Sequence, residues 1–211
     1  MEINGKSVVA VCAGLLAFFV VRAAMTPHTP TAEEGKQAVA KTMAELQEKA
    51  QARGGHESKS DATAGAATDM ATRQLADAPA AKRPALAASQ FIGFYYVNSV
   101  VMRDVCQAEG VDIGAYVEAF RNEHTAEHAR AATLVQAAGF SEDQVTGALA
   151  ANRGQVQAMI QQTMRDTAAQ LGKTTVKEGC TIFAEHPAIV ANARKLSTMS
   201  PGMWKAFMAP G

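Results

Sequence analysis

The chain has 211 residues, enough for one domain or two, and 48% of them are hydrophobic, which suffices for a buried core. Its 20 basic and 20 acidic residues cancel, so neither a basic surface for nucleic acid nor an acidic tail for a basic partner is indicated. Aromatic residues make up only 6% and gather mostly in 91–96, 116–120 and 204–207, so the core is expected in the C-terminal part.

The first element is an uncharged apolar segment over residues 7–21. Its length of about 15 residues is short of the roughly 20 that a membrane-spanning helix needs, and it matches the apolar region of a secretory signal. A small-residue cleavage site is available at 21–23. Residues 1–25 are therefore expected to be either a cleaved signal peptide or an uncleaved anchor that contacts the membrane through residues 7–25.

The next part, residues 26–85, is predicted to contain a polar helix and a flexible linker. Thr31–Ala52 has a helical composition, with Thr31 as its cap and basic residues near its end. Its apolar positions form a thin stripe of Val39, Met43, Leu46 and Ala50. A stripe of about two heptads is too short to specify a coiled-coil oligomer.

From Arg53 to about Ala85 the chain consists of small and polar residues with almost no large apolar side chain. Such a segment cannot bury enough surface to offset the entropy that it loses on ordering. The sequence therefore predicts a disordered, Ala-rich tether between the polar helix and the folded domain.

Residues 86–211 are predicted to form that domain, because apolar residues recur there at helical spacing. The expected helices are Leu86–Glu109, Asp112–Ala138, Ser141–Leu171 and Thr174–Glu185, followed by a turn over Val190–Leu196 and a short tail. The first is apolar almost all round and should be central. No segment alternates with period two, and short loops favour antiparallel neighbours. The predicted fold is all-α: a small bundle of four to five helices.

Two cysteines, Cys106 and Cys180, lie in the predicted domain. In an exported protein they allow a single disulfide, which would close a loop of about 75 residues and stabilise the fold by roughly 4 kcal/mol. The alternative is a pair of buried free thiols. Because the N-terminal segment indicates export, the disulfide is favoured.

The most distinctive local motif is His124-x-x-Glu127-His128, the spacing found in inverted zinc peptidases. On one helix the two histidines would face the same way, as two ligands of a divalent metal must. Both also continue the apolar stripe of Val117 and Phe120, so they would fall on the core side. Three interpretations remain open: a hydrogen-bonded polar layer in the core, a solvated edge, or a metal site formed by His124, Glu127 and His128.

The C-terminal tail is amphipathic, with Met203, Trp204, Phe207 and Met208 on one face. Such a face either caps the core of its own domain or fits into a groove of a partner protein.

No nucleophile elbow, phosphate-binding loop or dinucleotide fingerprint is present, and no residue is assigned a catalytic role. We therefore expect a non-enzymatic interaction or scaffold protein of the cell envelope, binding a protein partner. It would be anchored in the inner membrane facing the periplasm, or periplasmic or secreted after cleavage. The alternative is a bundle that binds a metal or small ligand at the histidine motif.

Overall fold

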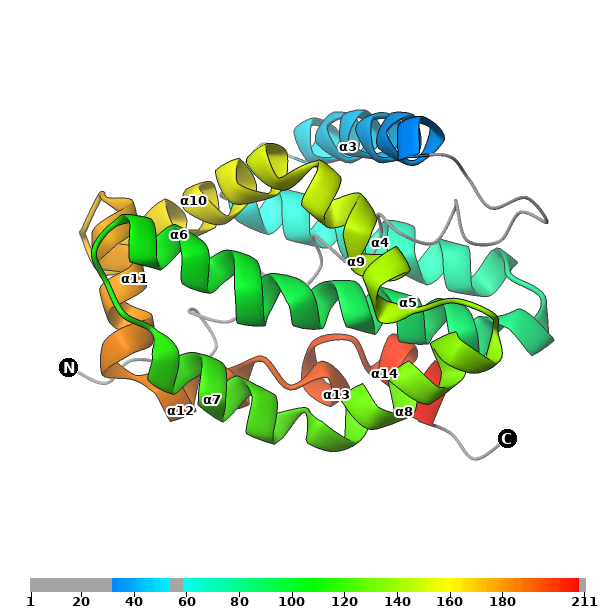
Figure 1. The fold of residues 1–211 in the computed structure, drawn as a ribbon. Helices are drawn as coiled ribbons and strands as arrows, with labels where there is room; N and C mark the ends of the chain where they lie inside the picture. The colour runs from blue at the N-terminus through cyan, green and yellow to red at the C-terminus, as the bar shows by residue number, and fades with distance from the viewer. Residues whose placement is uncertain (1–31, 54–58, 209–211) are drawn as a thin grey trace.

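The structure, a computed structural model, describes residues 32–53 and 59–208 of the chain. Within these two stretches every regular element is a helix, which confirms the predicted all-α class (Figure 1). The helices are more numerous than the predicted four to five, because breaks divide several of them. The apolar segment 7–21, and with it the choice between signal peptide and anchor for residues 1–25, lies outside the described residues.

One long helical path runs through the middle of the bundle and is called the central helix below (Figure 1). It consists of α5 (Arg83–Tyr96), the π-helical segment η2 (Val97–Val101) and α6 (Met102–Ala108). Pro84 stands in its first turn, where a missing N–H costs nothing, and Gly110 ends it with a φ of 74°. Most of its side chains from Leu86 onward are buried, as the apolar pattern predicts.

The stretch Ala80–Ala108 is long and apolar enough to cross a membrane, with a mean hydropathy of 1.2 in its most apolar window. However, 78% of that window is buried inside the bundle. A helix that is apolar all round is expected in the core of a protein as well as in a membrane. Its position in the core therefore accounts for its composition.

Two N-terminal helices join the bundle: α4 packs on α5, and α3 packs on α4 and α9. The helix α3 (Ala32–Arg53) agrees with the predicted polar helix, whereas α4 (Lys59–Asp77) lies where a flexible linker was predicted, and that prediction is wrong for these residues. The face of α4 that packs on α3, α5 and α10 contains the buried side chains of Ala62, Ala66, Ala67, Met70, Ala71 and Leu75. Alanine favours the helix and loses no side-chain entropy on burial. The folded unit therefore includes α3 and α4.

Two bent helices flank the central helix (Figure 1). Their halves are α7 (Gly114–Glu123) with α8 (Thr125–Ala137), and α9 (Glu142–Ala151) with α10 (Arg153–Ala169). Each was predicted as one continuous helix, which is wrong at His124 and Asn152, where φ is −108° and −111°. The predicted start at Ser141 is confirmed, because Ser141 caps α9, whereas α7 begins at Gly114, two residues after the predicted Asp112, whose carboxylate accepts a hydrogen bond from the Gly114 N–H at 2.8 Å.

The C-terminal part supplies four shorter helices, α11 (Val176–Glu185), α12 (Pro187–Ala193), α13 (Leu196–Met199) and α14 (Pro201–Met208). Thr175 and Glu178 form a capping box at the start of α11. His186 separates α11 from α12, because the residue before a proline avoids the α region, and α12 begins at Pro187. The chain then returns along the bundle, so that α14 packs against α5 and α8.

The disulfide predicted from the sequence is present. Cys106 near the end of the central helix and Cys180 in α11 are joined, with their Cα atoms 5.5 Å apart, and both are fully buried. The bond ties the end of the central helix to a helix much later in the chain.

Close packing of α10 and α11 generates a prediction about Gly179. A Cβ atom on Gly179 would lie 2.1 Å from the backbone oxygen of Met164, so the two helices would have to separate. We expect Gly179→Ala to lower the free energy of unfolding by about 2 kcal/mol or more, because overpacking against backbone is costly. Urea unfolding followed by circular dichroism measures it.

The matched control is Gly147→Ala, in α9. A Cβ there meets no atom within 4 Å, and alanine is favoured over glycine inside a helix by about 0.5–1 kcal/mol. Gly147→Ala should leave stability unchanged or raise it. Equal effects of the two substitutions would show that α10 and α11 are not packed this closely.

Candidate functional site

The histidine motif lies at the break between α7 and α8, where His124 is the residue between the two helices. Its side chain turns inward and is 1% exposed. Nδ1 lies 2.9 Å from the carbonyl oxygen of Phe120, which can only accept, so Nδ1 donates this hydrogen bond. Its ring also contacts Phe120 and Phe94, with centroids 4.3 Å and 5.8 Å away.

Burial lowers the pKa of His124 below its ordinary value of 6.5, because the charged ring would lose its hydration. The hydrogen bond to Phe120 and the carboxylates of Glu127 and Glu123 act in the opposite direction but do not outweigh burial. His124 is therefore a neutral member of the aromatic core near pH 7. His124 is thus the one residue of the motif that lies in the core, and it forms no polar layer there with Glu127 and His128, which are partly exposed.

The other two residues of the motif point elsewhere. His128 stacks on Tyr95, with ring centroids 4.2 Å apart, and its Nε2 lies 3.3 Å from Glu142 Oε2. Glu127 accepts a hydrogen bond from Trp204 Nε1 at 3.3 Å. In the described part of the chain no group of three or more His, Cys, Asp or Glu side chains is placed to hold a metal ion. The structure thus does not bring His124, Glu127 and His128 together as ligands.

The tail residues belong to the core of their own domain. Met203 and Phe207 are buried, and the Phe207 ring lies 5.4 Å from that of Phe91. Trp204 and Met208 are half-buried against the same core. Since Met203 and Phe207 are already covered, they cannot also fill a partner's groove in this conformation, and the tail acts as a cap.

A buried polar cluster is centred on Asn98 of the π-helical segment η2 and includes Tyr116 and Arg194. Asn98 donates to the carbonyl of Phe94 at 2.9 Å, and its Oδ1 accepts from Tyr116 Oη at 3.1 Å and from Arg194 Nη1. The guanidinium carbon of Arg194, which is 1% exposed, lies 4.9 Å from the centroid of the Phe183 ring. A cation in such a setting is stabilised by the face of the ring as well as by hydrogen bonds.

Arg194 was not among the functional residues predicted from the sequence. The sequence does contain a signal for its burial. Arg194 follows the apolar Val190 by one helical turn, so at the end of α12 it lies on the same inward side as the buried Val190. The cluster is enclosed by core side chains, and we assign it a role in fixing the helices around η2.

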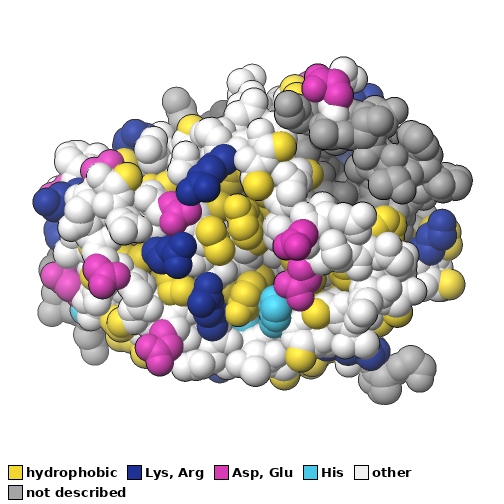
Figure 2. All heavy atoms as spheres, viewed as in Figure 1, with side chains coloured by type: hydrophobic (Ala, Val, Ile, Leu, Met, Phe, Trp, Pro, Cys, Tyr) yellow, Lys and Arg dark blue, Asp and Glu magenta, His cyan; other side chains and the backbone are white. Residues whose placement is uncertain are grey.

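A broad apolar area on the face shown in Figure 2 lies over the central helix, between α7–α8 and α9–α10. We call it the tyrosine face and define it by the partly exposed Tyr95, Tyr96 and Val100 of the central helix. Its rim contains Arg103, Asp104, Arg121, His128, Glu142 and Arg153. Basic side chains border the apolar area on the left of Figure 2, and acidic side chains and a histidine border it on the right.

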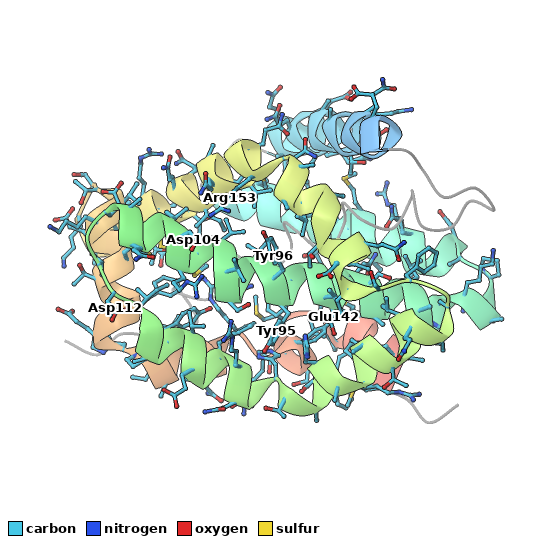
Figure 3. The ribbon with its side chains drawn as sticks, viewed as in Figure 1. Tyr95, Tyr96, Asp104, Asp112, Glu142 and Arg153 are labelled. Carbon is cyan, nitrogen blue, oxygen red and sulfur yellow. A yellow bond between two sulfur atoms is a disulfide. The ribbon has the colours of Figure 1, made fainter. Side chains whose placement is uncertain are left out.

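The two tyrosines lie in the middle of this face (Figure 3). Burial raises the pKa of Tyr95 above its ordinary value of 10.0, while the charge of Arg121 lowers it and that of Glu142 raises it. Both charges therefore lie near the Tyr95 ring, which carries a neutral hydroxyl. A surface of this composition can bind a partner by contact with aromatic rings and by ion pairs at the rim.

Comparisons with protein-family models, with curated proteins and with solved structures found no significant match.

Burial of His124 predicts an acid-sensitive stability. Because its pKa is lower in the folded protein, the unfolded chain binds more protons below pH 6.5, and the free energy of unfolding falls as the pH falls from 6.5 toward the folded pKa. We expect His124→Gln to reduce the loss of stability between pH 7.5 and 5.5, measured by urea unfolding at each pH.

The control is Gln136→Asn, which changes an exposed residue of α8 and removes no titratable group. This variant should retain the pH dependence of the unsubstituted protein. If His124→Gln retained it as well, the buried, neutral state assigned to His124 would be wrong.

Proposed function

We propose that the chain is a non-enzymatic interaction protein of the cell envelope and that its binding surface is the tyrosine face. The observation that carries this proposal is the partial exposure of Tyr95, Tyr96 and Val100 within residues 86–102 of the central helix, whose other residues are buried. Tyrosine and arginine are enriched where proteins bind one another, because both combine large contact area with polar atoms. The partner in this proposal is a protein.

The envelope location rests on two features. The disulfide between Cys106 and Cys180 is compatible with an oxidising compartment, since such bonds are rare where thiols are kept reduced. The apolar segment 7–21 has the composition of an export signal. In this proposal the helical domain works outside the cytoplasm, with residues 1–25 either cleaved or retained as an inner-membrane anchor.

The alternative function, metal or ligand binding at the histidine motif, gains no support from the geometry. His124 is enclosed by aromatic rings, and His128 turns to the surface beside Glu142.

Site-specific photo-crosslinking in living cells tests the binding surface. A benzophenone amino acid replaces Tyr96 in the full chain, and illumination should yield a discrete protein adduct in the envelope fraction. The matched control places the same amino acid at Lys177, an exposed position of α11, and should yield none. The proposal fails if position 96 gives no adduct, or if both positions give the same adducts.

A further inference from the structure

The two ends of the tyrosine face differ in charge. At the α6 end, Arg153 Nη2 lies 2.6 Å from Asp104 Oδ2, and Arg103 Nη2 lies 3.4 Å from Asp104 Oδ1. One carboxylate cannot neutralise two guanidinium groups, so this end keeps a net positive charge. The side chains of Arg103 and Arg153 are 46% and 50% exposed, so both can also reach a partner.

The opposite end is acidic. Glu142 is 42% exposed, and its partner His128 carries a charge only when protonated. The carboxylate of Glu142 gives this end an exposed negative group. Figure 3 shows Glu142 on one side of Tyr96, and Asp104 with Arg153 on the other side. The tyrosine face is thus an apolar strip with a positive end and a negative end.

Such a strip is complementary to itself after a rotation of 180° about an axis perpendicular to the face. Arg103 lies two helical turns beyond Tyr96, about 10 Å along the central helix. An axis that passes near Tyr96 and Val100 would bring Arg103 of one copy toward Glu142 of the other, and the symmetry would form this contact twice. The apolar residues would meet in the middle.

We propose that the partner of the tyrosine face is the same face of a second copy of this chain, with the two central helices antiparallel. This inference rests on the proposed function, because it names the partner of the same surface. A closed twofold contact also uses both charged ends at once, whereas a partner of one charge would satisfy only one of them. Exposed ion pairs determine the orientation of the two copies but contribute little to the free energy of association. We therefore expect a weak dimer, which high salt weakens further.

Charge reversal tests the arrangement, using Arg103→Glu and Glu142→Arg in the full chain, purified from the envelope in mild detergent. Arg103 is chosen because its replacement leaves the Arg153–Asp104 ion pair in place. Analytical ultracentrifugation over a concentration series gives the dimer dissociation constant of each protein. Each single variant places like charges opposite each other twice, and should weaken the dimer about tenfold or more.

The decisive sample is an equal mixture of the two single variants. In a mixed dimer, the acidic side chain introduced at position 103 of one copy faces the basic side chain introduced at position 142 of the other. At the symmetric contact the native Glu142 and Arg103 pair with each other. The mixture should therefore regain the dissociation constant of the unsubstituted protein. The exposed α11 variants Lys177→Glu and Glu185→Arg are controls and should dimerise normally.

The inference is overturned if the unsubstituted chain stays monomeric up to about 1 mM, a concentration that detects even feeble association. It is also overturned if both single variants dimerise normally, if the controls weaken the dimer equally, or if the mixture does not recover. Because the substitutions leave residues 1–31 unchanged, association through that segment would not respond to them. A Tyr96 adduct with a different protein would keep the proposed function and remove the second copy as partner.

Discussion

The long central helix can exist in water only if other helices cover it, and the whole arrangement follows from that requirement. A buried helix of this length must be covered on several sides at once, which a chain can do only by returning to it repeatedly. The helices α4, α8, α9 and α14 each pack on α5, and α7, α10 and α11 pack on the part beyond it. The disulfide fixes the far end of the helix to α11. The tyrosine face is a place where this cover is incomplete.

Polar contacts, as well as apolar packing, fix the positions of the helices around the central helix. The π-helical segment carries Asn98, which accepts hydrogen bonds from Tyr116 of α7 and from Arg194 at the end of α12. A buried arginine needs such partners, since a charge removed from water without compensation is costly. The requirement fixes how α7 and α12 sit on the central helix. Close to it, His124 divides α7 from α8 and faces the same aromatic core.

Local signals in the sequence were sufficient for much of the fold. Ser141 at the start of α9, Gly110 at the end of the central helix and Pro187 at the start of α12 act on the backbone next to them, so their effects can be predicted without the rest of the chain. The pairing of Cys106 with Cys180 also followed, because the predicted domain contains no other cysteine.

Features that depend on distant surfaces could not be predicted in this way. The helix α4 looked like a linker because its apolar side chains are mostly alanine, and alanine forms a core only where another helix comes close. The breaks at His124 and Asn152 were missed because helical periodicity continues across them. The tyrosine face could not be predicted for a related reason. Tyr95 and Tyr96 are aromatic like the buried residues beside them in the sequence, and only the positions of the flanking helices leave them partly exposed.

The central functional claim is that this helical domain works outside the cytoplasm, and the oxidation state of Cys106 and Cys180 in intact cells tests it most directly. Cells that make the full chain with Cys12→Ser are denatured in a maleimide reagent, with and without prior reduction. The account predicts two reactive thiols after reduction and none before it, whereas a chain that lacks residues 1–25 should react without reduction. Two reactive thiols in the unreduced full chain would contradict the account.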